Sequence, residues 1–182
     1  MVVKIYFVTG NSAKTDYLSR QLGIEIEHKK LDIDEIQSLN LEEIVIDKAK
    51  KAFELVKKPV IVEDASLTIE GMGGLPGPLV KWFFESIGNE GICRFTDVSA
   101  TRNAVTEVVF GYCDNDGVKT FTGSKAGLIS REPRGKDGFG WDAVFIPHGY
   151  NKTRAEMTQS EMDLSTMRKE AIEKLADYLH AI

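Results

Sequence analysis

The sequence predicts an α/β fold, built as a single domain of two lobes with a mixed sheet and a cleft. Two observations favour this class: strand-like and helix-like segments alternate at both ends of the chain, and an extended antiparallel region lies between them. No internal repeat or low-complexity linker divides residues 1–182, and a chain of 182 residues can bury a substantial core. We therefore expect one domain over the whole chain.

The first segments alternate between strand and helix signals. Residues 2–8 (VVKIYFV) are β-branched and aromatic, which predicts a buried strand. Ser12 is the expected N-cap of a helix that ends at Gly23, and residues 24–33 alternate weakly as a second strand.

A second helix and a short strand follow. Asn40, with a glutamate three residues later, predicts the start of a helix that reaches about Val56. The strand over residues 59–62 ends before two adjacent acids, Glu63 and Asp64. Open α/β sheets bind their ligands at such strand ends, so both acids are candidate site residues.

The second half of the chain is typical of an antiparallel region followed by a helix. A glycine-rich loop, GMGGLPGP, leads into a predicted helix over residues 79–87. Residues 103–113 and 118–123 predict a hairpin, and a further strand and loop reach a last strand over 143–147. An amphipathic helix is expected from about residue 163 to 179. Its inward side chains would be Leu164, Met167, Ile172, Leu175 and Leu179.

The charge balance excludes some partners. Lys and Arg give 23 positive charges against 28 negative charges from Asp and Glu, a net charge of −5. Duplex nucleic acid and anionic membranes need a basic surface, so neither is expected as the main partner. The apolar runs are far shorter than the roughly 20 residues of a membrane span, and the N-terminal segment passes directly into a polar loop, unlike a signal peptide. Small anionic ligands are not excluded, because they need only a local cluster of cations.

Cysteine and histidine usage excludes several catalytic classes. Cys93 and Cys113 form no CxxC pair and fit reduced thiols of a cytoplasmic protein better than a disulfide framework. The three histidines are not clustered in the sequence, which argues against histidine-based zinc sites and Ser-His or Cys-His nucleophiles. The chemistry must therefore depend on carboxylates, lysines and backbone amides.

The first candidate site is the turn TGNSAK between the first strand and the first helix. Such a turn presents backbone N–H groups and the positive end of the helix dipole, which suits a phosphate. An ordinary βα turn with a surface lysine would have the same sequence features. The predicted binding residues are Thr9, Gly10, Asn11, Ser12, Ala13 and Lys14.

Three acids form the second candidate site. Glu63 and Asp64 follow a buried strand, and Glu35 in the polar loop LDIDEIQ can reach the same edge of the sheet. Hard oxygen ligands of this kind suit Mg²⁺, which is usually held by one or two carboxylates, waters and substrate phosphates. Alternatively, Glu35 is a solvated loop acid and Asp64 a turn or N-cap residue.

The loop GKDGFGWD, residues 135–142, is the third candidate site. Its glycines allow a tight turn that offers the rings of Phe139 and Trp141, with Asp142 as an acceptor, for stacking and edge recognition of a base. Alternatively, the aromatic side chains complete the core, Trp141 in particular. Three further cations fall on predicted helices, where a solvated position is the default: Lys48, Lys81 and Arg168.

Together these strings resemble the inosine triphosphate pyrophosphatase family, which acts on noncanonical purine nucleoside triphosphates. The resemblance rests on FVTGNSAK, LDIDEIQ, VEDASL, GGLPGPLVKWF, GFGWDAVF and TRAEM, in this order and over nearly the whole chain. It implies an elongated two-lobed α/β fold, usually a homodimer, with the active site in the central cleft between the lobes. The implied reaction is Mg²⁺-dependent hydrolysis of ITP, dITP or XTP to the monophosphate and pyrophosphate, which cleanses the nucleotide pool.

The resemblance also implies roles for the candidate residues. Residues 9–14 and Lys48 would hold phosphates, and Glu35 and Asp64 would bind the metal, with Asp64 also matching the proton acceptor of catalysis. Ala65 and Lys81 would contact the substrate. The base pocket would consist of Phe139, Gly140, Trp141, Asp142 and Arg168, with the arginine reading the purine carbonyl.

The segment before the last helix departs from the family pattern E-K-N-x-x-S-H-R. It reads EMDLSTMR, so Met162, Thr166 and Met167 replace the lysine, serine and histidine, while Arg168 remains. Two alternatives follow: the same hydrolase with an altered or broadened base preference, or a non-catalytic nucleotide-binding module. Retention of the metal and phosphate residues speaks against the second alternative, because binding alone would not require a metal site.

Overall fold

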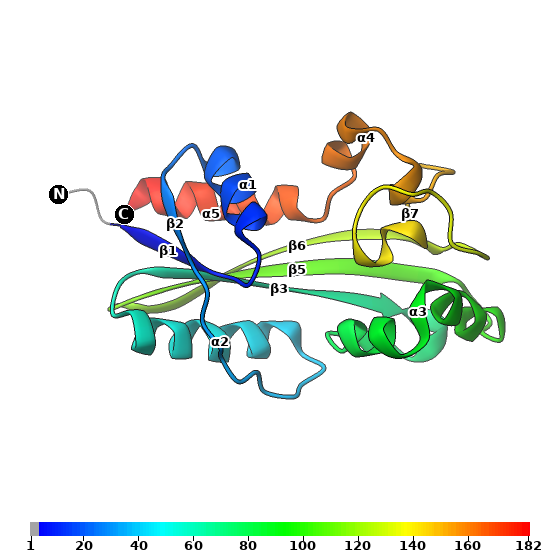
Figure 1. Cartoon of the computed structure of the whole chain (residues 1–182), viewed down its shortest axis with the longest axis horizontal. Helices are drawn as coiled ribbons and strands as arrows, with labels where there is room; N and C mark the ends of the chain where they lie inside the picture. The colour runs from blue at the N-terminus through cyan, green and yellow to red at the C-terminus, as the bar shows by residue number, and fades with distance from the viewer. Residues whose placement is uncertain (1–3) are drawn as a thin grey trace. The chain divides into compact units, whose positions relative to one another are not determined.

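The chain folds as an α/β protein with a mixed sheet, as the sequence predicts. In the computed structural model, which describes residues 4–182, seven strands form a sheet of order β2-β1-β3-β5-β6-β7, and β4 pairs with β3 off this path (Figure 1). β1 is parallel to β2 and β3, whereas β4 is antiparallel to β3 and β7 to β6. Residues 2 and 3 of the predicted first strand lie outside the described residues.

The bounds of the elements are as follows. The strands are β1 (Ile5–Val8), β2 (Ile26–Lys29), β3 (Val60–Ile69), β4 (Pro76–Gly77), β5 (Asn103–Asp114), β6 (Gly117–Ile129) and β7 (Phe145–Pro147). The α-helices are α1 (Ser12–Leu22), α2 (Leu41–Val56), α3 (Val80–Asp97), α4 (Gln159–Leu164) and α5 (Arg168–Ala181). Short 3-10 turns are η1 (Glu70–Met72), η2 (Gly140–Ala143) and η3 (Arg154–Glu156).

Contacts divide the chain into two compact units. Unit 1 comprises the residues up to Asp64, residues 108–123 and residues 170–182, and unit 2 comprises residues 65–107 and 124–169. The boundaries cross β3, β5 and β6, so these strands contribute residues to both units. That the two units form one domain around a cleft stays a prediction.

In unit 1, helices cover both faces of the strands. α2 lies on one face, and α1 and α5 lie on the other (Figure 1). Val45 and Ala49 of α2 pack against Val60 and Val62 of β3 in a cluster of small and β-branched side chains. Small side chains let the helix approach the strands closely, so this face is tightly filled.

The helix ends of unit 1 follow capping chemistry. Asn11 is the N-cap of α1, because its side chain accepts the Ala13 N–H at 3.0 Å, and the predicted cap Ser12 is instead the first helical residue. Gly23 ends α1 in a left-handed conformation with φ 67°, as predicted. Asn40 caps α2 as predicted and accepts two N–H groups of the first turn.

β3 is longer than the sequence predicts, and this changes where its acids lie. The expected strand over 59–62 instead covers Val60–Ile69, so Glu63 and Asp64 lie within the strand and not beyond its end. Strand alternation separates the two acids: Glu63 is buried and Asp64 is partly exposed. The strand continues through them because each acid has a lysine partner, described below, that compensates the burial of its charge.

Other elements also differ in length from the prediction. β2 covers only Ile26–Lys29, and the strands of the hairpin extend to Asn103–Asp114 and Gly117–Ile129. α3 continues past residue 87 to Asp97 after a kink at Gly88, whose φ of 65° only glycine adopts readily.

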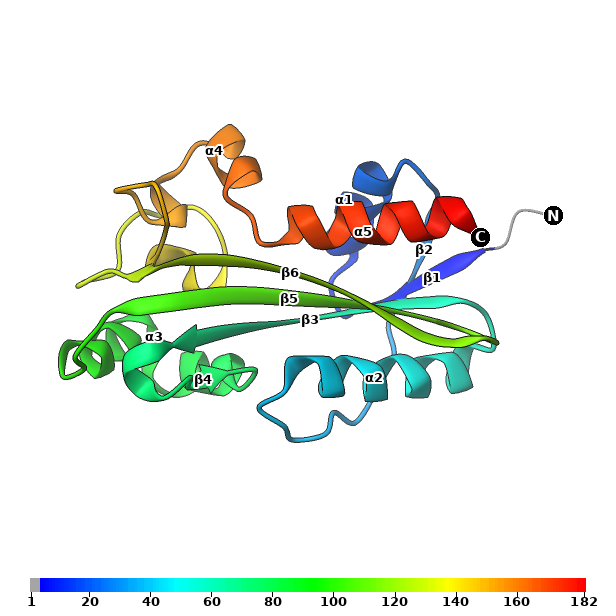
Figure 2. The same ribbon diagram turned by 180° about the vertical axis from the view of Figure 1, so that it is seen from behind.

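In unit 2, α3 covers one face of the strands (Figure 2). Val80 and Ile92 of α3 belong to one buried cluster with Leu67 and Ile69 of β3. Thr68 lies between these two strand residues and therefore points to the opposite face. The two faces of the unit 2 strands thus have different environments.

The predicted C-terminal helix is two helices. A capping box of Thr158 and Glu161 starts α4, and Thr166 Oγ1 accepts the Arg168 N–H where α5 begins. Leu164, predicted to face inward, is 64% exposed because it lies at the end of the separate helix α4. Three of the predicted inward residues are buried, namely Met167, Ile172 and Leu175, and Leu179 is partly buried.

A substitution at Gly111 of β5 tests how tightly the side chains under α2 are packed. A Cβ at this position would lie 2.7 Å from Val45 Cγ1 and 3.2 Å from Val62 Cγ2. We expect Gly111→Ala to lower the free energy of unfolding by about 1–3 kcal/mol, because the added methyl group overpacks the cluster. Gly10→Ala is the matched control, since a Cβ there meets no atom within 4 Å. Urea denaturation measures both variants, and equal stabilities would contradict this packing.

We expect three buried titratable groups to lower the stability at alkaline pH. Burial, followed by the nearby Asp114 charge, raises the pKa of Tyr112, and burial raises the pKa of the Cys93 and Cys113 thiols. The unfolded chain releases these protons near the ordinary pKa values of about 8.5–10, while the folded chain retains them. This contribution to stability is therefore present at lower pH and lost as the pH rises through these values.

We accordingly expect the free energy of unfolding to decrease above about pH 8.5. Tyr112→Phe should reduce the slope of that decrease above about pH 10, because the phenol no longer titrates in the unfolded chain. Denaturant titrations at a series of pH values measure the slope. An unchanged slope in Tyr112→Phe would contradict the assignment.

Candidate functional site

The turn between β1 and α1 is held by its own polar groups. The Asn11 N–H donates to Thr9 Oγ1 at 3.2 Å, the Ala13 N–H to Asn11 Oδ1 at 3.0 Å, and the Lys14 N–H to the Asn11 carbonyl at 3.2 Å. These three N–H groups therefore already have acceptors within the turn. In the described part of the chain, the exposed Gly10 and Ser12 donate no N–H to an acceptor.

His28 contacts this turn, and the sequence did not predict this role. Its Nε2 lies 2.8 Å from the Thr9 carbonyl oxygen, and the Thr9 N–H donates to the Lys29 carbonyl at 3.1 Å. Parallel pairing places His28 opposite Phe7, beside the end of β1. The spacing of His28 in the sequence gives no signal of this contact, because only the pairing of β1 with β2 creates it.

Two predicted metal ligands meet at one lysine in unit 1. Lys48 Nζ, on α2, lies 2.5 Å from Glu35 Oε1 and 3.9 Å from Asp64 Oδ2. The Lys48 side chain is 17% exposed, so the ammonium is partly shielded from water. Within this unit, the structure therefore brings Glu35, Lys48 and Asp64 together.

The loop that carries Glu35 is anchored to the core of unit 1. Leu31 and Ile33 pack against the cluster under α2, and Lys51 Nζ donates to the Asp34 carbonyl at 2.8 Å. In an extended chain, residues 31, 33 and 35 point to the same side. The anchoring of the two apolar residues therefore directs Glu35 toward α2, where Lys48 lies.

Lys14 makes an ion pair with a buried acid. Its Nζ lies 3.2 Å from Glu63 Oε1, and the Glu63 side chain is only 4% exposed. A carboxylate at this depth needs a cationic partner, so Lys14 stabilises the fold in addition to its predicted role with phosphate. An ammonium has three donors, and this pair therefore does not exclude a phosphate contact.

The acids of unit 1 fit a hard divalent cation. Glu35 and Asp64 both approach the same ammonium within 4.0 Å, so their oxygens converge on a single position of positive charge. Residues 4–182 contain no group of three or more His, Cys, Asp or Glu side chains that could hold a metal. Two carboxylates completed by waters and substrate phosphates are a ligand set typical of Mg²⁺. The donor set thus fits Mg²⁺ and not a metal that needs a cage of protein ligands.

The aromatic loop of unit 2 presents Phe139 to solvent. Phe139 is 87% exposed, and its N–H donates to Asp142 Oδ2 at 2.8 Å, which closes the turn η2. Gly138 and Gly140 adopt left-handed conformations, with φ 86° and 65°, that this tight loop requires. Trp141 packs against the buried cluster under α3 and therefore contributes to the core. The exposed Phe139 ring, by contrast, can stack on a ligand.

Three further predicted substrate residues belong to unit 2. Ala65 follows Asp64 in β3, and Arg168 begins α5. Lys81 is exposed on α3 with its Nζ 5.4 Å from the ring centroid of Trp82.

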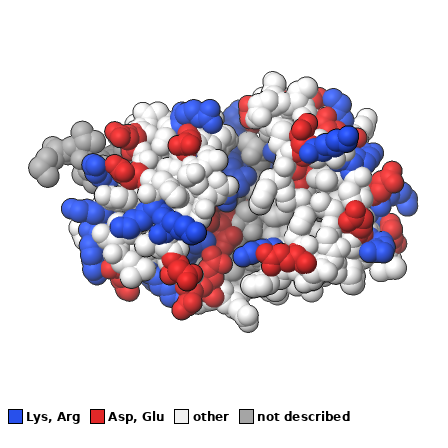
Figure 3. All heavy atoms as spheres, viewed as in Figure 1, with Lys and Arg blue, Asp and Glu red and all other residues white. Residues whose placement is uncertain are grey.

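Charged side chains of both signs lie close together on one face of the molecule. On the face shown in Figure 3, Lys and Arg side chains alternate with Asp and Glu, in keeping with the net charge of −5. Within residues 4–182, no helix is both long and apolar enough to cross a membrane.

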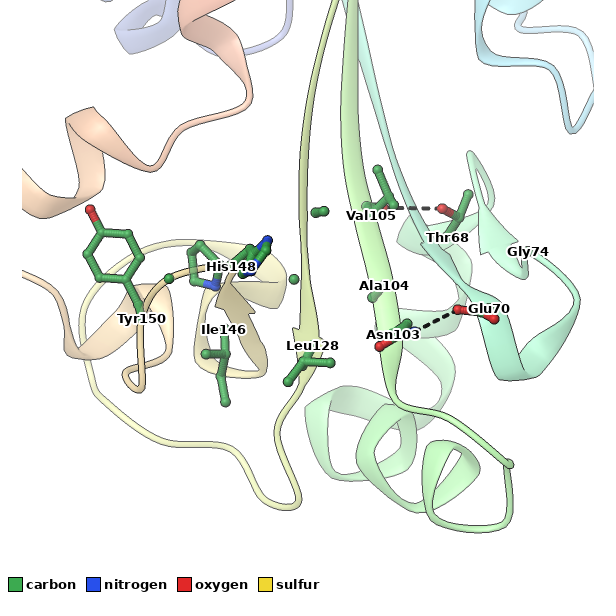
Figure 4. Close-up of a pocket in the computed structure, with 14 residues that line it drawn as sticks. Thr68, Glu70, Gly74, Asn103, Ala104, Val105, Leu128, Ile146, His148 and Tyr150 are labelled. Carbon is green, nitrogen blue, oxygen red and sulfur yellow. Dashed lines mark hydrogen bonds between the residues drawn. The ribbon is translucent and has the colours of Figure 1, made fainter.

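Unit 2 also contains a cavity that none of the predicted site residues lines. It has a volume of about 610 Å³ and lies on the face of the strands opposite α3. Thr68, Val105, Leu128, Ile146 and His148 line it from four strands and the segment after β7 (Figure 4). Its lining is mostly apolar, and Val105 and Leu128 are 37% and 46% exposed.

Comparison with known proteins identifies the family. Residues 5–178 match the Ham1 family. A dITP/XTP pyrophosphatase of Methanopyrus kandleri is 41% identical over 97% of this chain and 96% of its own length. An inosine triphosphate pyrophosphatase of Schizosaccharomyces pombe is 41% identical over 97% of this chain and 95% of its own. A HAM1 protein structure from Coxiella burnetii superimposes with a TM-score of 0.90 at 25% identity, and the match covers 100% of both chains. The family match and the near-complete similarity to these relatives show that the chain belongs to the Ham1 family.

Proposed function

We propose that this protein hydrolyses noncanonical purine nucleoside triphosphates, namely ITP, dITP and XTP, to the monophosphate and pyrophosphate, and so cleanses the nucleotide pool. The observation that carries the proposal is the approach of Glu35 and Asp64 to one ammonium, that of Lys48. A non-catalytic binding module would not need paired carboxylates there. The names of the relatives at 41% identity, dITP/XTP and inosine triphosphate pyrophosphatase, support the same reaction.

Residues of unit 1 would bind the triphosphate. Lys14, Lys48 and the remaining N–H donors of the turn would hold phosphate oxygens, since each contributes positive charge or a donor. Glu35 and Asp64 would hold Mg²⁺, which supplies charge neutralisation for the phosphates when it is bound. Asp64 would also accept a proton from the water that attacks the α-phosphorus, and pyrophosphate would leave as the bond between the α- and β-phosphates breaks.

Unit 2 would recognise the base. The exposed Phe139 ring would stack on the purine, while Gly140, Trp141 and Asp142 would complete its binding site, and Ala65 and Lys81 would contribute further substrate contacts. Arg168 would donate to the purine carbonyl. A 6-keto purine accepts a hydrogen bond at the position where adenine donates one, so an arginine there disfavours ATP.

A broadened base preference is the second candidate, and two residues favour it. Met162 and Met167 stand where the family pattern has lysine and histidine, and a thioether offers no strong hydrogen bond to a base. Met167 is moreover buried, at 6% exposure. Comparison of the rates with ITP, XTP, dITP, GTP and ATP distinguishes the two candidates, because equal rates on ITP and ATP would favour the broadened enzyme.

Asp64→Asn tests the proposed chemistry. We expect kcat for ITP to fall by at least about 100-fold, because the amide neither accepts the proton nor carries the charge that holds the metal. Asp16→Asn, the same change at an exposed position of α1, should retain the wild-type rate. Pyrophosphate release measures both, and EDTA should abolish the wild-type activity until Mg²⁺ is restored.

Two outcomes would contradict this proposal. Release of no pyrophosphate from any nucleotide of the panel by the wild-type protein would exclude the hydrolase function. Near-wild-type activity of a folded Asp64→Asn variant would remove Asp64 from the mechanism.

We also propose that the protein is a cytoplasmic homodimer. Its cysteines in the described residues, Cys93 and Cys113, are free and buried, which suits a reducing compartment. The face of unit 2 opposite α3 exposes Val105 and Leu128 around a largely apolar cavity. Exposed apolar faces of this kind are typical of interaction surfaces, and a second copy of the chain would cover this one.

Leu128→Asp tests the dimer. We expect the wild-type protein to elute as a dimer and Leu128→Asp as a monomer, because a buried unpaired carboxylate would oppose association. Val98→Asp is the matched control, since Val98 is 88% exposed and does not line the cavity. Size-exclusion chromatography with light scattering measures the mass. A monomeric wild type, or a dimeric Leu128→Asp variant, would contradict the proposed interface.

A further inference from the structure

Arg154 makes a set of contacts that none of the proposed roles uses. It lies in η3, within the string TRAEM, and its side chain is only 14% exposed. Its Nε donates to Asp142 Oδ1 at 2.9 Å, and its Nη1 donates to Ser165 Oγ at 2.9 Å and to the Met162 carbonyl at 3.2 Å. One guanidinium therefore joins the aromatic loop to the segment that contains α4 and precedes α5.

On one side, Arg154 fixes the acid that closes the aromatic loop. Asp142 uses Oδ2 to accept the Phe139 N–H at 2.8 Å and Oδ1 to accept from Arg154. Asp142 is 14% exposed, so this charge-assisted pair is largely shielded from water. A Cβ at Gly138 would lie 2.7 Å from Asp142 Oδ2, which shows how closely the loop folds over this carboxylate. The position of the exposed Phe139 ring therefore depends on the orientation that Arg154 gives to Asp142.

On the other side, Arg154 holds the chain that leads to Arg168. Ser165 is 1% exposed and Met162 is the residue that replaces the family's lysine. Thr166 follows directly and accepts the Arg168 N–H at 3.2 Å. Movement of the segment between α4 and α5 would thus displace the start of the helix that carries Arg168.

Arginine is suited to this task and lysine is not. The planar guanidinium donates from several nitrogens in fixed directions, so it can bond a carboxylate on one edge and a hydroxyl and carbonyl on another. An ammonium is a single point of charge and could keep the pair with Asp142 only if it gave up the contacts with the α4–α5 segment.

We propose that Arg154 is a positioning residue for base recognition, which holds the Phe139 loop and the segment before Arg168 in one fixed arrangement. The proposal rests on the base-binding role given to Phe139 and Arg168 under the proposed function. Arg154 itself touches neither the phosphates nor the metal in this account, so its loss should affect the base and not the triphosphate.

Binding measurements on the Arg154→Met variant distinguish an effect on base recognition from an effect on triphosphate binding. Isothermal titration calorimetry with IMP should show binding about tenfold weaker than for the wild type, while inorganic triphosphate with Mg²⁺ should bind equally well to both proteins. Arg134→Met is the matched control. Arg134 also pairs with a carboxylate, Glu156, and donates to the Asn151 carbonyl, but these contacts involve neither the aromatic loop nor α4.

Two further measurements exclude a merely structural effect. KM for ITP should rise by about tenfold in Arg154→Met with a smaller change in kcat, and Arg154→Lys should recover only part of the loss. Hydrogen exchange at the Phe139 amide should become faster in Arg154→Met and remain at the wild-type rate in Arg134→Met, because only the first variant releases Asp142.

The outcomes distinguish this proposal from the function on which it rests. Unchanged IMP affinity and unchanged Phe139 exchange in a folded Arg154→Met variant would overturn it, whatever the activity of the wild type. Equal weakening of IMP and inorganic triphosphate would also overturn it, because that result indicates general loss of structure. An inactive wild type that binds IMP, with binding weakened only by Arg154→Met, would support Arg154 while excluding the hydrolase function.

Discussion

The contact of Lys48 with Glu35 and Asp64 is the interaction on which the chemistry of unit 1 depends. Two carboxylates that converge on one position repel each other unless a cation lies between them, and here the cation is the Lys48 ammonium. The Lys14–Glu63 pair meets the same need for the buried neighbour of Asp64. Bound Mg²⁺ would supply the charge that Lys48 now provides, which would leave this lysine available to phosphate oxygens. The same acids and lysines would thus stabilise the protein without substrate and hold the triphosphate with it.

In unit 2, a different constraint operates: the position of the exposed Phe139 ring must be fixed without burying the ring. The exposed Phe139 ring has little packing to hold it, so polar contacts must hold the backbone around it. Asp142 and Arg154 provide them, in a place where both side chains are largely shielded from water. Ion pairs and hydrogen bonds among shielded groups orient a side chain more firmly than those on the surface. In the proposed function, these contacts would hold the loop in place for stacking on a base.

The sequence predicted the elements of this protein better than their ends, and the candidate residues better than their contacts. Periodicity and capping residues such as Asn40 and Gly23 located the helices of unit 1, because these signals are local. The strand β3 continued past its predicted end because Lys14 and Lys48, which are distant in sequence, compensate its acids. His28 and Arg154 were missed for the same reason: their roles arise from strand pairing and from contacts between loops. Leu164 was misplaced because the break between α4 and α5 depends on the polar contacts of Thr158 and Thr166.

The position of bond cleavage tests the central claim most directly. Hydrolysis of ITP by the wild-type protein in water enriched in heavy oxygen, followed by phosphorus NMR, shows which phosphorus the water attacks. Attack at the α-phosphorus places the label in IMP and leaves pyrophosphate unlabelled, and this is the result that the account predicts. Label in pyrophosphate would show attack at the β-phosphorus and would contradict the proposed step. Label in orthophosphate would show attack at the γ-phosphorus, and it would contradict the assignment of this chain as a nucleoside triphosphate pyrophosphatase.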